Sequence, residues 1–454
     1  MKATKNAFTQ HVAVPILLSI AAGVSPCAHA ANWLDLQGNE PPGAKYFTFW
    51  GFAQPTYIRN EGNAVSGLTG AANITAYNGR VPLFNLVAPD NDRREQLQMF
   101  RARLGARGVI PGTDEKINYF FLTEFGNNGL TREHLPVISD ASLSFNFIPG
   151  ARVRAGLFKA PLGEEALQAI HVFDYVNFSA VTDNLALERF VAPITTTRPL
   201  NVPVGLNAAN IVGAVAAFRD VGVQVYDSFR NDKWEYAYAA MIGLGNGIDF
   251  NDRNGKLDVT ARLQASYVFE GKGPRRQDVT AYLWQQNGKR TFAGKDYDRM
   301  RRGAGVKYVA TPFRFGVEYI DGTGMIFNGV NPPFNDVGSG FQPVAIVGLD
   351  SSNKAKGYYV DAGWTINKQW ELDARYDEFN RLTNSAANER KFSTWTLGAQ
   401  YFFDSTLRVA FNYEIRDLKV SNPDAIPAGP NRNNANILAD SIGNRANLQL
   451  TWVF

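Results

Sequence analysis

The last ten residues, 445–454, read Arg-Ala-Asn-Leu-Gln-Leu-Thr-Trp-Val-Phe. Apolar side chains occupy every second position from Ala446 to Phe454, and the positions between them are mainly polar. A repeat of two places all the apolar side chains on one face of an extended strand. The same alternation runs through residues 259–269 and 313–319. It therefore predicts β-strands far beyond this terminal stretch.

The alternation predicts about sixteen strands along the chain, most of them about ten residues long. This length suits a tilted strand that crosses a bilayer. The predicted strands lie near residues 46–58, 97–109, 116–125, 139–147, 151–159, 214–228, 233–243, 257–270, 277–285, 299–310, 313–320, 356–366, 369–380, 391–402, 407–416 and 445–454.

The connections between these strands alternate between short and long. Short turns include Pro149-Gly150 and Thr311-Pro312. The long connections lie near residues 59–96, 126–138, 160–213, 244–256, 286–298, 321–355, 381–390 and 417–444. This succession is typical of outer-membrane barrels, which have short periplasmic turns and long external loops. We therefore expect an all-β fold: one transmembrane antiparallel β-barrel domain of about 16 strands over residues 31–454.

The composition agrees with a membrane barrel and disfavours several other classes. The chain has 454 residues, of which 45% are apolar, 13% aromatic and 19% charged. This is too aromatic and too weakly charged for a disordered protein. A soluble β-sheet protein would also alternate, but its outward face would be polar. Here the apolar face carries aromatic side chains that suit the girdles at membrane interfaces, namely Trp364, Trp395, Tyr401, Trp452 and Phe454.

The first 30 residues have the features of a secretory signal peptide. Lys2 and Lys5 precede an apolar stretch over residues 12–24, and Ala28-His29-Ala30 forms a small-x-small cleavage signal. Cleavage after Ala30 would remove the only Cys and lower the net charge from +4 to +2, because Lys2 and Lys5 are the only formal charges in this segment. A balance this small gives no argument for nucleic acid as a partner.

A barrel of sixteen strands is wide enough to enclose an aqueous channel. The connection over residues 160–213 is the third external loop, and we expect part of it to fold into the lumen and narrow the pore. The alternative is an exposed loop that packs on neighbouring loops or on a partner subunit. The candidate constriction residues are Glu164, Glu165, Asp174, Asp183, Glu188 and Arg189.

Basic side chains share one face of several predicted strands. In residues 99–107, Arg101, Arg103 and Arg107 fall on one face, while Phe100, Ala102, Leu104 and Ala106 fall on the other. Because a charge facing lipid is costly, the arginine face should line the lumen, where it would favour anions. The predicted pore-lining residues are Arg101, Arg103, Arg107, Arg152, Arg154, Lys159, Arg262, Arg301 and Lys307. The alternative is that these cations stiffen the wall by pairing with the acids Asp258, Glu318, Asp361, Glu371, Asp373 and Glu414.

Four short stretches, at residues 101–108, 140–145, 154–165 and 218–225, resemble the phosphate-selective porin O and P family. The resemblance implies a sixteen-stranded barrel, a homotrimer, and diffusion of anions or small solutes. The terminal Phe454 resembles the signal that the barrel-assembly machinery reads. The resemblance carries over Arg101, Arg103, Arg152, Arg154 and Lys159 as pore residues. Lys159 is out of phase with the others, so its place assumes a bend before Pro161.

These patterns predict a passive outer-membrane porin for small hydrophilic solutes, with a preference for anions, phosphate-like ones among them. Outer-membrane lipid and lipopolysaccharide would surround it. We expect no catalysis, no cofactor and no metal, since only His134 and His171 remain after residue 30 and both lie in predicted loops. The alternative is a non-conducting or substrate-specific barrel that acts in adhesion or partner recognition through loops such as 321–355 and 417–444.

Overall fold

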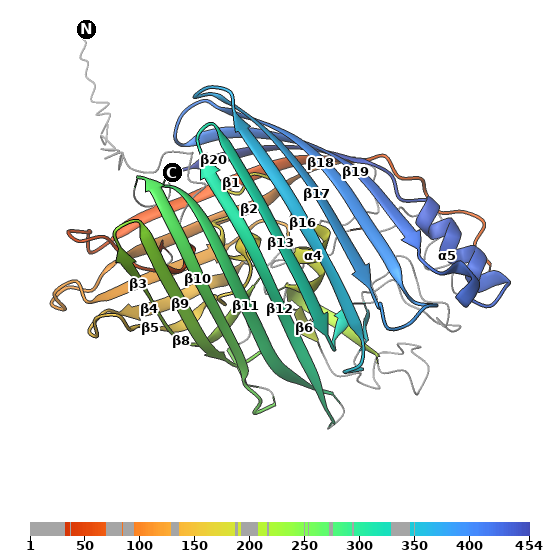
Figure 1. Ribbon diagram of the computed structural model, residues 1–454, viewed down its shortest axis with the longest axis horizontal. Coiled ribbons are helices and arrows are strands. Elements are labelled where there is room, and N and C mark those ends of the chain that lie inside the picture. Colours follow the sequence, from red (N-terminus) through yellow and green to blue (C-terminus); the bar gives the residue numbers. More distant parts are fainter. Residues whose placement is uncertain are drawn as a thin grey trace, which may run out of the picture.

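The computed structural model describes residues 32–36, 38–69, 84, 95–128, 136–186, 189–191, 208–215, 218–248, 250–252, 254–271, 276–292, 295–327, 346–348 and 350–454. Within these residues, sixteen antiparallel strands form a closed barrel in sequence order (Figure 1). They are β1 (Thr48–Asn60), β2 (Glu95–Val109), β3 (Ile117–Glu124), β4 (Val137–Phe145), β5 (Arg152–Lys159), β8 (Arg219–Asn231), β9 (Trp234–Gly243), β10 (Asp258–Glu270), β11 (Gln277–Phe292), β12 (Lys295–Ala310), β13 (Phe313–Thr323), β16 (Lys354–Thr365), β17 (Trp370–Arg381), β18 (Arg390–Phe402), β19 (Leu407–Val420) and β20 (Arg445–Val453).

The terminal strand closes the barrel. β20 pairs with β19 on one side and with β1 on the other. The backbones of Phe454 and Gly51 exchange two hydrogen bonds, of 3.0 and 2.8 Å. The predicted all-β barrel of sixteen strands is thus confirmed, and each predicted strand corresponds to one strand of the barrel.

The outward face of the barrel is apolar, as the alternation predicts. Leu97, Leu283 and Trp395 are 76%, 56% and 53% exposed. Aromatic side chains gather near the short turns and contact one another there, as between Trp452 and Phe454 at 4.9 Å. Such a band anchors a barrel at the membrane interface. Among the described residues, no helix is both long and apolar enough to span a membrane.

The remaining elements are short. α1 (Trp33–Leu36) precedes the barrel, and η1 (Pro423–Ala425) and α5 (Pro430–Asp440) follow β19. Between β5 and β8 lie α3 (Glu164–Leu167), α4 (Ala180–Leu185), β6 (Arg189–Val191) and β7 (Ala208–Val215). β6 and β7 join β14 (Ile326–Phe327) and β15 (Ile346–Gly348) in a small sheet of order β14-β15-β7-β6. The predicted strand over 214–228 merged the end of β7 with β8, which begins at Arg219.

The hairpin of β11 and β12 extends through most of the predicted loop 286–298. Its outer part carries polar cross-strand pairs, including Lys289 with Asp298 at 2.6 Å and Thr291 with Asp296 at 2.6 Å. Both faces of this extension are polar because it lies beyond the apolar band. The alternation of hydrophobicity therefore stops before the strands do.

The prediction that Phe100 faces outward is wrong. The register between β1 and β2 shifts at Gln54 and Pro55, so that Phe100 has no partner in the pairing and is only 1% exposed. A bulge adds one residue to a strand and changes which face the side chains take. Arg101 and Arg103 still point into the barrel, where they are 4% and 6% exposed.

The expected bend before Pro161 is placed at Gly156, where the backbone has an unusual conformation. Gly156 has φ of +126°, in a region that favours glycine. Arg154 and Lys159 are both buried although they stand five residues apart. A Cβ atom at Gly156 would lie 2.1 Å from the carbonyl oxygen of Ala141.

Replacing Gly156 by Ala is expected to destabilise the barrel by more than the roughly 1–3 kcal/mol of backbone strain alone, because the new methyl group also meets the β4 backbone. Guanidinium unfolding in detergent would measure the loss. Gly112→Ala is the matched control, since Gly112 also has a positive φ, of +79°, but nothing within 4 Å of its Cβ position. Equal losses in the two variants would contradict the contact with Ala141.

Candidate functional site

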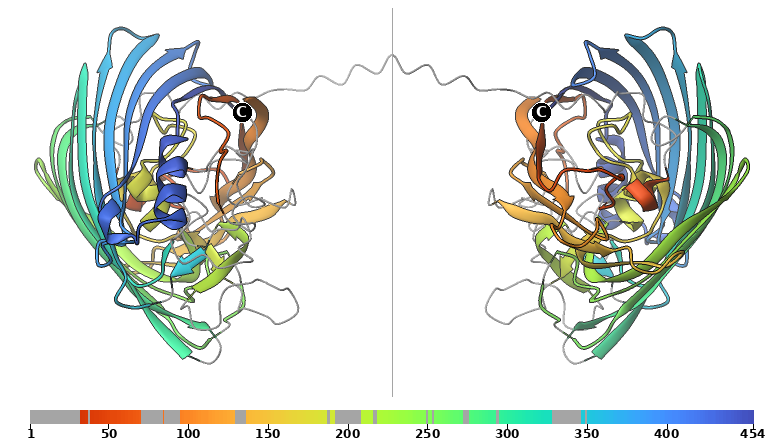
Figure 2. Two further views of the ribbon diagram at one scale, coloured as in Figure 1. Left: turned by 90° about the vertical axis from the view of Figure 1, so that its right-hand side faces the viewer. Right: turned by 90° about the vertical axis from the view of Figure 1, so that its left-hand side faces the viewer.

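Residues 160–186 lie inside the barrel, and we call them the inserted segment. None of these residues is exposed. Figure 2 shows α4 and the chain around it enclosed by the ring of strands. The segment contacts strands on the far side from its origin: the backbone N–H of Val176 donates to Asn412 of β19 at 2.7 Å. It therefore crosses the lumen instead of lying on the rim.

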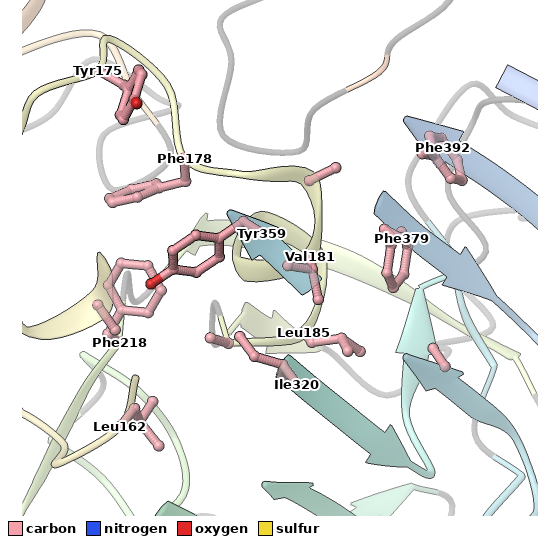
Figure 3. Packing of buried hydrophobic residues seen from close by; sticks show 14 of the residues in the cluster. Leu162, Tyr175, Phe178, Val181, Leu185, Phe218, Ile320, Tyr359, Phe379 and Phe392 are labelled. Carbon is pink, nitrogen blue, oxygen red and sulfur yellow. The ribbon is translucent and has the colours of Figure 1, made fainter. Parts of the chain in front are cut away.

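Apolar side chains hold one side of the inserted segment against the wall. Val181 and Leu185 of α4 are 0% and 1% exposed. They belong to a cluster with Ile320 of β13 and Tyr359 of β16, and Figure 3 shows the four side chains gathered together. Burial of this kind contributes roughly 1.5–3 kcal/mol per large side chain. The apolar residues of the inserted segment thus pack inside the barrel.

Three ion pairs anchor the start of the inserted segment. The carboxylate of Glu164 contacts Arg262 of β10 at 3.0 Å and Lys307 of β12 at 2.7 Å. Glu165 contacts Arg375 of β17 at 2.8 Å. The backbone N–H of Glu164 also donates to Glu318 at 3.0 Å. Arg262 and Lys307, which the sequence predicts as pore-lining, therefore hold the inserted segment in place.

Glu164 lies in the connection between two spanning strands, and its charge depends on these contacts. Burial raises the pKa of Glu164, but Lys307 and Arg262 outweigh burial and bring the pKa below its ordinary value. Further along, burial and the nearby Arg408 lower the pKa of His171 to about 3. At neutral pH Glu164 is therefore charged and His171 is not.

Both ends of α4 are clamped from the wall. At its beginning, the backbone N–H of Ala180 donates to Asp377 at 2.8 Å, and Ser179 caps the helix through the N–H of Thr182. At its end, Arg301 Nε donates to the carbonyl of Leu185 at 2.9 Å. Arg301 also donates to the carbonyls of Met300, Thr323, Gly324 and Met325. Its guanidinium therefore ties α4 to the β12–β13 hairpin.

Arg314 of β13 is surrounded by carboxylates. It pairs with Asp174 of the inserted segment at 3.3 Å and with Asp361 and Glu371 of the wall at 3.0 Å each. Asp373 is a further partner. Arg314 is 7% exposed, so this cluster is largely shielded from solvent. This side of the lumen has an excess of negative groups around one guanidinium.

Buried cations outnumber buried carboxylates along β2, β3, β4, β5 and β8. There, Arg103 pairs with Glu124 at 2.6 Å and Arg219 with Asp140 at 2.9 Å. The same wall carries three more buried cations, whose hydrogen bonds go to neutral groups. Arg101 donates to Gln54, Arg154 to Ser144 and Tyr226, and Lys159 to the carbonyls of Leu167 and Gln168.

Among the described residues, no carboxylate forms an ion pair with Arg101, Arg154 or Lys159, so their charges are not cancelled by a direct partner. Five buried cations in the described part of this wall thus accompany four buried carboxylates, namely Glu124, Asp140, Asp220 and Asp227.

The other predicted site residues are placed as follows. Arg107 and Arg152 are partly exposed and pair with Glu40 at 3.2 Å and with Asp227 at 3.5 Å. Asp183 lies buried in the first turn of α4. Arg189 begins β6, and Glu188 lies outside the described residues. Whether these side chains line the conducting path or form the constriction stays a prediction.

The sequence analysis did not single out several buried arginines of the barrel, among them Arg219, Arg314, Arg375 and Arg408. Arg314 and Arg408 occupy the inward positions of strands whose alternation is clear, so parity alone would have found them. Parity does not reveal that Arg314 gathers four carboxylates. Those partners come from β16, β17 and the inserted segment.

Comparisons with known proteins agree with this geometry. The model of the family "Phosphate-selective porin O and P" matches residues 350–433. No curated protein sequence matches the chain. Among solved structures, the anion-selective porin from Comamonas acidovorans has 13% identity and a TM-score of 0.51, covering 90% of this chain and 99% of that one. At this identity the likeness concerns the fold alone.

Two further structures are similar at lower scores. OmpF of Salmonella typhi has 14% identity and a TM-score of 0.48, covering 90% of this chain and 97% of that one. The outer-membrane channel DcaP of Acinetobacter baumannii has 13% identity and a TM-score of 0.47, covering 92% and 99%.

A closed sixteen-stranded barrel with an apolar outer face and a charged interior is the architecture of outer-membrane channels of the porin class. The family match, which spans β16 to β19 and the start of α5, confirms the resemblance to the phosphate-selective porins O and P.

Proposed function

We propose that this channel passes small hydrophilic solutes by passive diffusion and prefers anions, phosphate-like anions included. One observation carries the preference: Arg101, Arg154 and Lys159 are buried on one wall of the lumen with hydrogen bonds to neutral groups. Cations that no carboxylate neutralises raise the local concentration of anions in a narrow aqueous path. Glu164 and Glu165 of the inserted segment do not oppose this effect, because they pair with cations of the opposite wall.

The family resemblance supports further parts of this proposal. The channel would form a homotrimer. It would lie in the outer membrane among lipid and lipopolysaccharide. The barrel-assembly machinery would insert it after reading the terminal Phe454. The signal peptide would direct export and be cleaved after Ala30, and both the peptide and its cleavage site lie outside the described residues. Gel filtration with light scattering would test the trimer, and sequencing the amino terminus of the exported protein would test the cleavage site.

The ion preference is tested by the zero-current potential across a planar bilayer in a KCl gradient. The parent channel is expected to show the sign of an anion-selective pore. The triple variant Arg101→Gln, Arg154→Gln, Lys159→Gln should lower the chloride-to-potassium permeability ratio by about threefold or more, since it removes three uncancelled luminal charges. Arg302→Gln is the control, because Arg302 carries the same charge but is 59% exposed on the outer surface.

A cation-selective sign for the parent would contradict the proposal. So would an equal change in the triple variant and in Arg302→Gln. Replacing chloride by phosphate in the same chamber ranks the two anions. Liposome swelling with small sugars separates the channel from a barrel that only displays its loops, because the latter would give no solute flux.

A further inference from the structure

The chain preceding β1 also enters the barrel. Residues 32–36 and 38–44, which we call the arm, lead from α1 to β1. Trp33 and Leu34 are 6% and 3% exposed although they belong to a helix of four residues. Figure 2 shows α1, in orange-red, within the ring of strands beside the inserted segment. A terminal segment this short gains such burial only by packing into the interior of the barrel.

Apolar contacts place α1 between the inserted segment and the wall. Trp33 and Leu34 form a cluster with Leu167 and Val172 of the inserted segment. On the other side, the cluster includes three wall residues of β8 and β9, namely Tyr226, Ala237 and Ala239. The small side chains of Ala237 and Ala239 leave room on the inner face of β9 for the indole and the leucine. The arm thus fills the space between the inserted segment and this part of the wall.

Polar contacts then hold the arm across the turn end of the lumen. Asn32 Nδ2 donates to Glu235 at 3.2 Å, at the start of β9. The hydroxyl of Tyr226 donates to Asn39 at 2.7 Å. Glu40 accepts from Arg107 at 3.2 Å, near the end of β2. Successive arm residues are therefore fastened to β9, β8 and β2, all close to the short turns.

The arm also holds two polar groups away from solvent. The indole N–H of Trp33 is buried and has no hydrogen-bond partner within the described part of the chain. Burial raises the pKa of Glu40 above its ordinary value in spite of Arg107, which lowers it. The arm therefore packs against the inner wall closely enough to keep water from these groups.

We propose that the arm is a second constriction, which narrows the lumen at its periplasmic end between the inserted segment and the wall of β8 and β9. Solute size is then limited by two elements in series. This inference rests on the channel function but not on the preference for anions. The proposed cleavage after Ala30 would leave one residue before Asn32, so that the mature amino terminus would begin inside the barrel mouth.

The test is the single-channel conductance of the full-length mature protein in symmetrical KCl. The double variant Trp33→Ala, Leu34→Ala is expected to raise conductance by about 1.5-fold or more, because removing two side chains widens the path that the arm narrows. A deletion of residues 32–40 should raise it further. The zero-current potential in a KCl gradient should keep its sign, so that this result is distinct from the ion preference.

The matched control is Tyr46→Ala with Phe47→Ala. These side chains lie just after the arm and are 63% and 62% exposed, so their removal leaves the lumen unchanged. Heat-modifiable mobility on gels verifies that each variant is a folded barrel. Folded arm variants with the conductance of the parent and of the control would overturn the proposal. A parent that inserts but passes no current would contradict the channel function itself.

Discussion

Replacing Arg314 by Met is expected to lower the free energy of unfolding by about 3–5 kcal/mol. Arg314 lies between Asp174, Asp361, Glu371 and Asp373, and its side chain is 9% exposed. Removing the guanidinium that contacts all four leaves carboxylates that repel one another in an enclosed space, where a poorly compensated charge is costly. Denaturant unfolding in detergent, followed by tryptophan fluorescence, would measure the change.

Arg302→Met is the control for this effect. Arg302 pairs with Asp321 at a similar distance, 2.9 Å, but its side chain is 59% exposed. Solvent screens such a pair, so the loss should be below about 1 kcal/mol. Adding Asp373→Asn to Arg314→Met should restore part of the lost stability, since it removes one of the repelling charges. Equal losses for the two arginines would show that the carboxylate cluster does not depend on Arg314.

Replacing Glu164 by Gln is expected to release the start of the inserted segment. The variant keeps the shape of the side chain but leaves Arg262 and Lys307 without the carboxylate they share. We expect a loss of about 3–5 kcal/mol, because two buried cations then face each other without the carboxylate that lies between them. Single-channel recordings should show a larger or more variable current, since the segment that crosses the lumen is no longer fastened to β10 and β12.

The same anchor should respond to acid. The folded-state pKa of Glu164 lies below its ordinary value, so the carboxylate contributes stability above its unfolded pKa of about 4.5. This contribution is lost as the pH falls through the lower folded value. The parent should therefore lose stability and gain current fluctuations below about pH 4.5, and Glu164→Gln should show less of this change.

Glu378→Gln is the control for Glu164. Glu378 pairs with Lys391 at 2.7 Å, the same distance as Glu164 and Lys307, but the lysine is 39% exposed. Its loss should cost less than about 1 kcal/mol and leave the current unchanged. If Glu164→Gln has the same single-channel current, the same current fluctuations and the same unfolding curve as the parent, the anchoring role of Glu164 is contradicted.

Much of the barrel could be predicted because its outer face contacts lipid and its inner face does not. Outward positions such as Leu263 and Leu283 must be apolar, and inward positions such as Arg262 must not face lipid. The alternation therefore reveals strands one at a time. The alternation failed in the outer part of the β11–β12 hairpin, where both faces are polar. It also failed at Phe100, where one extra residue in β2 turns the side chain from the outer to the inner face.

The interior of the lumen was less predictable. The sequence shows that residues 160–213 are too long for a turn, and that Arg262 and Lys307 point inward. It does not show that these two cations meet Glu164, which is 98 residues from Arg262 and 143 from Lys307. No sequence signal placed Trp33 and Leu34 inside the barrel, because a turn of four helical residues carries no periodicity.

The strand pattern, the inward parity of the arginines and the apolar coat follow from local sequence, because each strand must satisfy lipid and water independently. The closure of the barrel decides which charged side chains form ion pairs and which do not. Closing the sheet brings Glu164 to Arg262 and Lys307 and brings four carboxylates to Arg314. It leaves Arg101, Arg154 and Lys159 with neutral partners. Charge pairing acts over a few ångströms, and only the tertiary structure sets those distances.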